Sequence, residues 1–369
     1  MKIGVPKEIK TREFRVGMTP ASVREAVRCG HEVVVETNAG LGVDLTNDDY
    51  VDAGATIVET PEAAFEADLV VKVKEPQLNE CARLTPDHTL FTYLHLAADK
   101  PQAEALMASG CTAIAYETVT GRQGGLPLLR PMSEVAGRMS VQVGAWSLEA
   151  SQGGRGVLLG GVPGVPAAKV VILGGGVSGF NAAQMAVGAH ADVELFDVNL
   201  TRLEELDALF KNQVQTVFSN PTAVYEAVCQ ADLVIGAVLV PGGKAPKLVT
   251  KDMLKDMKKG AVLVDIAIDQ GGCFETSRPT GHDDPIYEVD GIVHYCVANM
   301  PGAVPRTSTF ALNNVTLPHT LSIANNGAVG AMKKDPHLLA GLNVMGGKIT
   351  YEAVAKDLDL EYAPAESFL

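Results

Sequence analysis

The first third of the chain alternates short apolar stretches with amphipathic ones. "KIGVPKE", "GHEVVVET", "TLFTYLHLA" and "CTAIAYETV" are rich in β-branched residues, and "TPASVREAVRCG" and "DKPQAEALMASG" between them have helical spacing. Strands that alternate with helices are typical of βαβ units, whose strands lie parallel in one sheet. The pattern predicts an α/β fold here.

The pattern changes at "RPMSEVAGRMSVQVGAWSLEA", where Val135, Met139, Val143 and Trp146 recur at helical spacing. This predicts one long helix with Ser133 as its N-cap. The glycine-rich "SQGGRGVLLGGVPGVPAAK" that follows suits a junction, and a second α/β series begins at Lys169. After Pro305, "TSTFALNNVTLPHTLSIANN" predicts another long helix that leads to a polar C-terminal tail.

The stretch "DLVVKVKEP" carries two lysines where a buried strand should be apolar. In a strand, Leu69, Val71 and Val73 share one face, and Lys72 and Lys74 lie on the other. A solvated edge strand would explain both lysines, since lysine at sheet edges blocks unwanted pairing. Alternatively, one ammonium group lies at a strand end where it binds an anion.

The most informative motif is "KVVILGGGVSGFNAAQMAVGAHADVELFDVN". A buried strand leads into Gly174, Gly176 and Gly179, a helical stretch follows, and a second strand ends at Asp197. Glycines let the backbone approach a pyrophosphate at the helix N-terminus, and the carboxylate binds a ribose hydroxyl. The motif predicts a dinucleotide site, and Asp197 favours NAD over NADP. Arg202 leaves NADP open, because an arginine can bind the extra phosphate.

Polar residues also follow other predicted strands. Asp269 ends "GAVLVDIAID", and Asn299 lies in "HYCVANMPG"; ligands of open α/β sheets gather at such strand ends. Arg15, Lys74 and His95 together offer two cations for a small carboxylate and a group for proton transfer. Each residue also has an alternative role that stays open. Asp269 could form a turn, and the role of Asn299 is ambiguous. Arg15 could form a loop salt bridge, Lys74 could be a solvated strand end, and His95 could be a core histidine.

Charge and composition narrow the partners. A formal charge of −14 over 369 residues disfavours nucleic acid and anionic membranes. No apolar run is long enough for a signal or a membrane span, so we expect a cytoplasmic protein. The six cysteines are scattered, with no spacing typical of zinc, and we expect no metal.

Long blocks of the sequence resemble alanine dehydrogenases in the same order, over nearly the whole chain. They include "MKIGVPKEIKTREFRVGMTP", "VKVKEP", "PMSEVAGR", "VLVDIAIDQGGCFETSRPT" and "VANMPGAVPRTSTFALNN". The resemblance implies an α/β protein of two doubly wound, Rossmann-like domains with a cleft between them, linked by long helices. Residues 1–130 plus 305–369 would form the substrate domain, and residues 131–304 the NAD-binding domain. It also implies a homo-oligomer, commonly a hexamer, that interconverts L-alanine, NAD and water with pyruvate, ammonium and NADH.

The resemblance assigns roles to individual residues. Arg15 and Lys74 would bind the substrate, His95 and Asp269 would be catalytic, and Lys72 would be merely solvated. The cofactor-binding positions it implies, with those of the glycine motif, are Ser133, Gly174, Gly176, Val177, Ser178, Gly179, Asp197, Arg202, Ser219, Val238, Leu239, Ile266, Asp269, Asn299 and Met300.

Three other functions stay open. The chain resembles the NAD-binding part of proton-translocating transhydrogenases in its dinucleotide half, although that protein needs membrane segments. A relative among the saccharopine-forming lysine enzymes would have to accommodate a much larger substrate. A non-catalytic NAD-binding protein would have no need for the set of Arg15, Lys74, His95 and Asp269.

Overall fold

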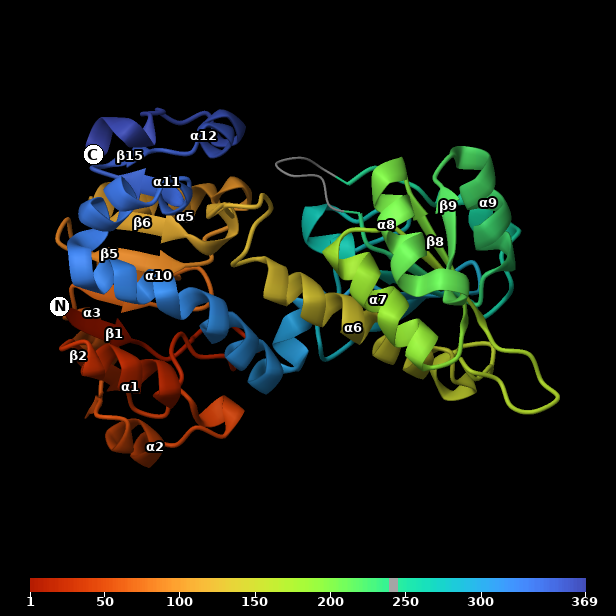
Figure 1. Ribbon diagram of the computed structural model, residues 1–369, viewed down its shortest axis with the longest axis horizontal. Coiled ribbons are helices and arrows are strands. Elements are labelled where there is room, and N and C mark those ends of the chain that lie inside the picture. Colours follow the sequence, from red (N-terminus) through yellow and green to blue (C-terminus); the bar gives the residue numbers. More distant parts are fainter. Residues whose placement is uncertain (239–244) are drawn as a thin grey trace. The chain divides into compact units, whose positions relative to one another are not determined.

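The computed structural model describes residues 1–238 and 245–369. The chain forms two compact units, which are drawn in Figure 1. Unit 1 combines Met1–Met132 with Val304–Leu369, and unit 2 comprises Ser133–Ala303. Each unit contains its own sheet.

The sheet of unit 1 has eight strands in the order β15-β14-β6-β5-β4-β1-β2-β3. The six strands from β3 to β6 run parallel, whereas β14 and β15 are antiparallel additions. The strands are β1 (Lys2–Val5), β2 (Glu32–Glu36), β3 (Thr56–Val58), β4 (Leu69–Val71), β5 (Thr89–Thr92), β6 (Thr112–Ala115), β14 (Leu342–Met345) and β15 (Lys348–Ile349).

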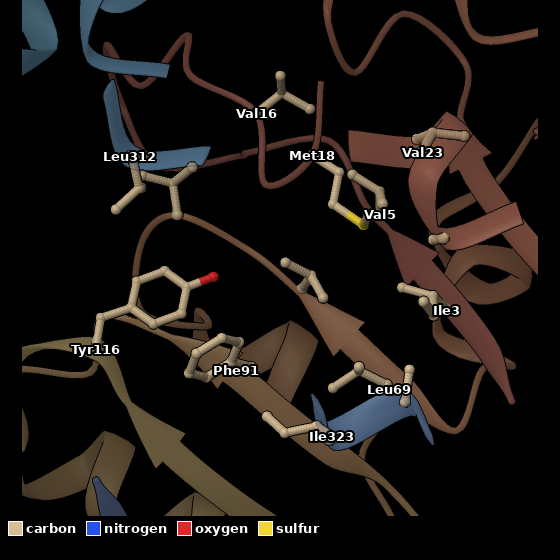
Figure 2. Packing of buried hydrophobic residues seen from close by; sticks show 14 of the residues in the cluster. Ile3, Val5, Val16, Met18, Val23, Leu69, Phe91, Tyr116, Leu312 and Ile323 are labelled. Carbon is tan, nitrogen blue, oxygen red and sulfur yellow. The ribbon is translucent and has the colours of Figure 1, made fainter. Parts of the chain in front are cut away.

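Helices cover both faces of this sheet. One face is covered by α1 (Pro20–Arg28), α2 (Asn47–Asp52), α10 (Pro305–Lys334) and α11 (Pro336–Leu339). The other is covered by α3 (Pro61–Phe65), α4 (Leu78–Cys81), α5 (Lys100–Ser109) and α12 (Glu352–Leu358). Figure 2 shows the first core, in which Leu312 and Ile323 of α10 belong to the same cluster as strand residues Ile3, Leu69 and Phe91.

The long helix predicted after Pro305 is confirmed as α10, which begins at Pro305. Proline is tolerated there because the first helical N–H has no intrahelical partner. The helix is interrupted at Gly327, whose φ of 70° and ψ of 162° are not helical. This backbone conformation is essentially restricted to glycine.

The sheet of unit 2 has seven strands in the order β12-β13-β11-β10-β7-β8-β9. All of them are parallel except β12, which pairs antiparallel with β13 at one edge. The strands are β7 (Lys169–Leu173), β8 (Asp192–Asp197), β9 (Gln215–Phe218), β10 (Leu233–Gly236), β11 (Val262–Asp265), β12 (Ile286–Val289) and β13 (Ile292–Tyr295).

The helices of unit 2 include the second long helix that the sequence predicts. They are α6 (Arg130–Ser147), which begins in unit 1, α7 (Val177–Gly188), α8 (Leu200–Phe210) and α9 (Pro221–Gln230). The expected N-cap at Ser133 is wrong, because α6 begins at Arg130 and Ser133 lies within it. Pro131 fits the first turn, so the helix starts before the serine.

Two further expectations about unit 1 are wrong. The C-terminal segment is not a polar tail, because Leu342 and Val344 are buried in β14 and extend the sheet beside β6. The stretch that contains Lys72 is not an edge strand either, since β4 lies between β1 and β5. Both of its faces are therefore covered by helices.

The parallel strands of both sheets follow the same doubly wound order, which confirms the Rossmann-like fold. In each sheet the chain starts in the middle, builds outward to one side and then crosses to the other. The order reverses between β1 and β4 in unit 1, and between β7 and β10 in unit 2. Ligands of such sheets bind outside the carboxyl ends of the strands at this reversal.

Candidate active site

In unit 1, three candidate residues follow three neighbouring strands. Arg15 lies in the segment after β1, Lys74 comes just after β4, and His95 comes just after β5. Because β1, β4 and β5 are adjacent and parallel, all three residues follow the same edge of the sheet. The strand order reverses between β1 and β4, so this edge is where a ligand of such a sheet binds.

Arg15 is 2% exposed and is held by Glu13. Its Nε and Nη2 donate to the two Glu13 carboxylate oxygens at 2.7 and 2.5 Å, and its Nη1 lies 3.1 Å from Met132 Sδ. Burial lowers the pKa of the guanidinium, but the hydrogen bonds and charge of Glu13 outweigh it and raise that pKa above its ordinary value. Arg15 is thus a preoriented cation in a buried position.

Lys74 is also largely buried, with 9% of its surface exposed. Its ammonium lies 3.6 Å from Glu75 Oε2, which is an ion pair beyond hydrogen-bond length. Lys10 donates to the other oxygen of Glu75. Burial raises the pKa of Glu75, but Lys74 and Lys10 outweigh burial and hold it below its ordinary value. The interpretation of Lys74 as a solvated strand end is therefore wrong.

Lys72 contradicts the expectation that it is solvated. It is 0% exposed, and its ammonium donates to Glu8 at 3.1 Å and to Glu80 at 2.8 Å. Burial lowers the pKa of Lys72, but the two carboxylates outweigh burial and raise it. A buried cation requires such partners, because a lone charge in a protein interior is strongly destabilising. The sequence pattern cannot identify these partners, because Glu8 is remote from Lys72 in the sequence.

His95 is exposed, so it is not a core histidine. Its ring stacks on Tyr93, with the centroids 5.7 Å apart and the planes 14° from parallel. Its backbone has φ 50° and ψ 38°, a left-handed conformation that is uncommon outside glycine. Glu117 accepts hydrogen bonds from the backbone N–H of His95 at 2.6 Å and of Leu94 at 3.1 Å. The imidazole is therefore exposed on a backbone that Glu117 fixes.

The glycine motif of unit 2 forms a tight strand-to-helix turn between β7 and α7. Gly174 has φ 106°, and a Cβ there would lie 2.8 Å from the carbonyl oxygen of Ala237. A Cβ on Gly179 would lie 1.8 Å from the carbonyl oxygen of Gly174. Gly176 is the N-cap of α7, and a Cβ there would have no neighbour within 4 Å. Two glycines are therefore required by packing, and the third leaves space at a helix N-terminus for a pyrophosphate.

Asp197 ends β8 beside this turn. Its carboxylate accepts the Gly175 N–H at 2.7 Å and the Asn199 N–H at 2.8 Å. Arg202 donates from Nε to the Gly175 carbonyl at 2.8 Å and forms an ion pair with Glu205 at 2.7 Å. The guanidinium is thus engaged by an acid and a carbonyl, and this arrangement fits a ribose with a free hydroxyl better than one with a phosphate.

Asp269 lies in a short 3-10 helix, Ile266–Gln270, directly after β11. The hydrogen bonds that hold this turn come from Asp265, which accepts the Ala267 N–H at 3.1 Å and the Cys273 N–H at 2.9 Å. Asp269 is exposed, and its carboxylate has no hydrogen-bond or ion-pair partner among residues 1–238 and 245–369.

Lys247 holds the same loop from the other side. Its ammonium donates to the carbonyl oxygens of Gly271, Gly272 and Phe274 at 2.5, 2.8 and 3.0 Å. The loop that carries Asp269 is therefore fixed by one carboxylate and one ammonium, neither of which the sequence pattern marks.

The other proposed cofactor positions lie in unit 2 at strand ends or helix starts. Ser178 donates from its hydroxyl to the Ser133 carbonyl at 3.0 Å, and the Ser219 N–H donates to the Asp197 carbonyl at 2.9 Å. Asn299 follows β13 with φ 56°. The remaining positions are Val177 at the start of α7, Val238 after β10, Ile266 after β11 and Met300 after β13, whereas Leu239 lies outside the described residues.

The residues that hold the candidates could be found from the sequence only in part. Glu13 lies two positions before Arg15, so an extended segment would place the two on the same side. Tyr93 lies two positions before His95, but the left-handed backbone of His95 means that strand alternation does not explain their stacking. Glu117 contacts the His95 backbone from 22 positions away, and no local pattern identifies it.

Within the described ranges, no helix has the length and apolarity needed to cross a membrane. The same residues contain no group of three or more His, Cys, Asp or Glu side chains that could hold a metal ion.

Comparisons with known proteins cover the whole chain. Residues 4–136 match the family model described as alanine dehydrogenase/PNT, N-terminal domain, and residues 140–352 match the corresponding C-terminal domain. The chain is 57% identical to an alanine dehydrogenase of Halomonas elongata over 100% of both chains. A solved L-alanine dehydrogenase superimposes with a TM-score of 0.95 at 54% identity, covering 97% of this chain and 99% of that one. A transhydrogenase structure from Sinorhizobium meliloti gives a TM-score of 0.81 at 26% identity, over 96% of this chain and 100% of that one.

Proposed function

Because the chain belongs to the alanine dehydrogenase/PNT family, we propose that it interconverts L-alanine, NAD and water with pyruvate, ammonium and NADH. The observation that carries this proposal is the identity of 54–57% to alanine dehydrogenases over the full chain. The geometry adds a reason, since Arg15, Lys74 and His95 follow one edge of one sheet.

Arg15 and Lys74 bind the substrate carboxylate in this proposal. A carboxylate needs cationic donors in fixed directions, and Arg15 is fixed by its two hydrogen bonds to Glu13. The ion pair of Lys74 with Glu75 is 3.6 Å long, beyond hydrogen-bond length, so the ammonium can donate to the carboxylate and to the carbonyl oxygen of pyruvate. This donation polarises the carbonyl for attack by ammonia.

His95 transfers the protons of the hydroxyl and amine groups as the carbinolamine forms and collapses. An imidazole suits this role because its ordinary pKa lies close to neutral pH. The ring is exposed and is oriented by stacking on Tyr93. Asp269 orients the attacking water or ammonia and stabilises the positive charge of the iminium, for which an exposed carboxylate is suited.

The glycine turn between β7 and α7 binds the cofactor in this proposal. The N-terminus of α7 binds the pyrophosphate, and Asp197 accepts hydrogen bonds from a ribose. Asp197 also disfavours a phosphorylated ribose, so we assign NAD rather than NADP. Bound at this turn, the nicotinamide would supply the hydride acceptor for Cα of alanine and, in its reduced form, the hydride donor for the imine.

A transhydrogenase activity is supported less well. The transhydrogenase structure shares 26% identity with this chain, about half the value for the alanine dehydrogenase structure. Exchange of hydride between two nucleotides also gives no role to a carboxylate-binding arginine and lysine beside a histidine. The same set of residues has no role in a non-catalytic NAD-binding protein.

We propose that the enzyme is cytoplasmic and that it is a homohexamer. Sedimentation equilibrium should find six times the monomer mass of 38.8 kDa. A mass of one or two monomers at micromolar concentration would contradict the hexamer without bearing on the reaction.

The reaction is tested by NADH formation when purified protein is mixed with NAD and L-alanine. D-alanine, L-lysine and NADP serve as parallel controls. Turnover with L-alanine and NAD alone supports the proposal. NAD binding without turnover on any amino acid would refute it and favour a non-catalytic or transhydrogenase-like protein.

A further inference from the structure

The backbone just after β4 lies beyond the point where β1 and β4 stop pairing. β1 pairs with β4 through Ile3 opposite Leu69 and Gly4 opposite Val70, and β1 ends at Val5. Past this point the chain after β1 leaves the sheet, so it offers no ladder partner to the residues after Val71. Buried N–H groups nevertheless need acceptors.

Glu8 supplies the missing acceptor. One oxygen of its carboxylate, Oε1, accepts the Val73 N–H at 2.7 Å and the Lys74 N–H at 3.3 Å. Glu8 lies in the segment that follows β1, so its side chain bridges the two segments that diverge at the reversal of strand order. The Glu8 side chain thus links the segment after β1 to the segment after β4, where the two backbones no longer pair.

Lys72 fixes the other oxygen of Glu8. Its ammonium donates to Glu8 Oε2 at 3.1 Å and to Glu80 Oε1 at 2.8 Å, and the side chains of all three residues are at most 3% exposed. Glu80 in turn accepts the Gln77 N–H at 2.8 Å at the start of α4. The two carboxylates therefore share one ammonium, but only Glu8 touches the backbone of Lys74.

The carbonyl groups of the same segment are held by neutral donors. The Tyr116 hydroxyl donates to the Lys72 carbonyl at 3.0 Å, and the Thr92 hydroxyl donates to the Lys74 carbonyl at 3.0 Å. Tyr116 packs edge-on against Phe91 in the core shown in Figure 2. Glu8 is thus the charged group that fixes this backbone directly.

We propose that Glu8, held by Lys72, is a positioning residue that orients Lys74 toward the substrate carboxylate. The inference rests on the proposed function, in which Lys74 binds alanine and pyruvate. It gives the buried Lys72 a role in substrate binding that it exerts through Glu8 and the backbone. Glu8 and Lys72 do not touch the substrate.

Glu80 provides a matched control, because it contacts the same ammonium without contacting the backbone of residues 73–74. Glu8→Gln and Glu80→Gln each remove one negative charge beside Lys72 and keep one oxygen acceptor. In each variant the single amide oxygen cannot serve both Lys72 and a backbone N–H, and the NH2 group faces another donor. The two variants differ in the backbone N–H affected, which is that of Val73 in Glu8→Gln and that of Gln77 in Glu80→Gln. The test measures the KM for pyruvate, the KM for NADH and the melting temperature of both variants.

We expect Glu8→Gln to raise the KM for pyruvate at least about tenfold, because small displacements of a positioning group are costly. Its KM for NADH should stay within about twofold, since the nucleotide motif lies in unit 2. Glu80→Gln should lower the melting temperature but keep the KM for pyruvate within about twofold. Should Glu8→Gln not fold, Glu8→Asp keeps the charge beside Lys72 but shortens the reach to Val73, and it should raise the same KM.

An equal rise of the pyruvate KM in the Glu8 and Glu80 variants would overturn the inference, because it would show a purely structural ion cluster. An unchanged pyruvate KM in Glu8→Gln or Glu8→Asp would overturn it as well. Wild-type protein that does not convert pyruvate at all would instead refute the proposed function, so the two failures are distinct.

Discussion

His95 keeps a backbone conformation that costs about 1–2 kcal/mol for a residue with a Cβ. Strain of this kind persists where surrounding contacts fix it, and here Glu117 accepts the backbone N–H groups of Leu94 and His95. The same geometry exposes the imidazole and stacks it on Tyr93. We interpret the backbone strain at His95 as the cost of holding its imidazole in an exposed position, where it can contact a ligand.

Replacing His95 by alanine should lower kcat by about 10²–10⁴-fold, because proton transfer loses its general acid and base. Binding of NADH, measured by fluorescence titration, should stay within about twofold. His88→Ala is the control, since His88 makes its hydrogen bonds to Thr85 and to the Phe65 carbonyl. Near wild-type turnover in His95→Ala would remove His95 from the mechanism.

His294 is a titratable residue of the interior. It lies in β13 with 0% exposure, and burial lowers its pKa to about 4 from the ordinary value of 6.5. The folded protein therefore keeps it neutral where the unfolded chain binds a proton, so stability falls as the pH drops from about 6.5 toward 4.

This residue should lower the free energy of unfolding by about 2 kcal/mol between pH 7 and pH 5. Urea unfolding of wild type and His294→Gln at both values measures the difference. The variant should be less stable at pH 7, since it disturbs hydrogen bonds to Thr276 and Ile292, but should depend less on pH. An equal pH dependence in the two proteins would show that His294 titrates normally.

Elements differ in how far their sequence predicts them. Buried strands with β-branched runs, such as β7 and β10, and the long helices α6 and α10 were predictable because their periodicity extends over many residues. β9, β12 and β15 are short and partly exposed, so packing rather than local pattern determines them. The start of α6 differs from the prediction because Pro131 is tolerated in the first turn of a helix, so the helix begins before Ser133.

The kink in α10 yields a prediction about this element. Gly327→Ala should lower the free energy of unfolding by about 1–3 kcal/mol, because its φ of 70° and ψ of 162° strain any residue with a Cβ. Space is not the cause, since a Cβ there has no neighbour within 4 Å. Gly330→Ala, three residues on in the same helix, should stabilise by up to about 1 kcal/mol. Urea unfolding of both variants compares them, and a loss at position 330 as large as at 327 would contradict the strain argument.

For the whole molecule, the sequence indicates two α/β series, the dinucleotide motif and the candidates Arg15, Lys74 and His95, and the resemblance assigns the roles of these three residues. Local patterns could not show that Val304–Leu369 joins Met1–Met132 in one unit, since that depends on contacts remote in sequence. The same limit hid the pairing of Glu8 with Lys72, which lies 64 positions away. The expectation that Lys72 is solvated is therefore wrong, because its two carboxylate partners come from other parts of the chain.

In the proposed reaction the protein moves a hydride directly from Cα of L-alanine to NAD. The decisive measurement incubates the protein with NAD and L-alanine deuterated at Cα, and determines the mass of the reduced cofactor. We predict NADH that carries one deuterium, together with unlabelled pyruvate. Unlabelled NADH, or no reduction of NAD by L-alanine, would contradict the account.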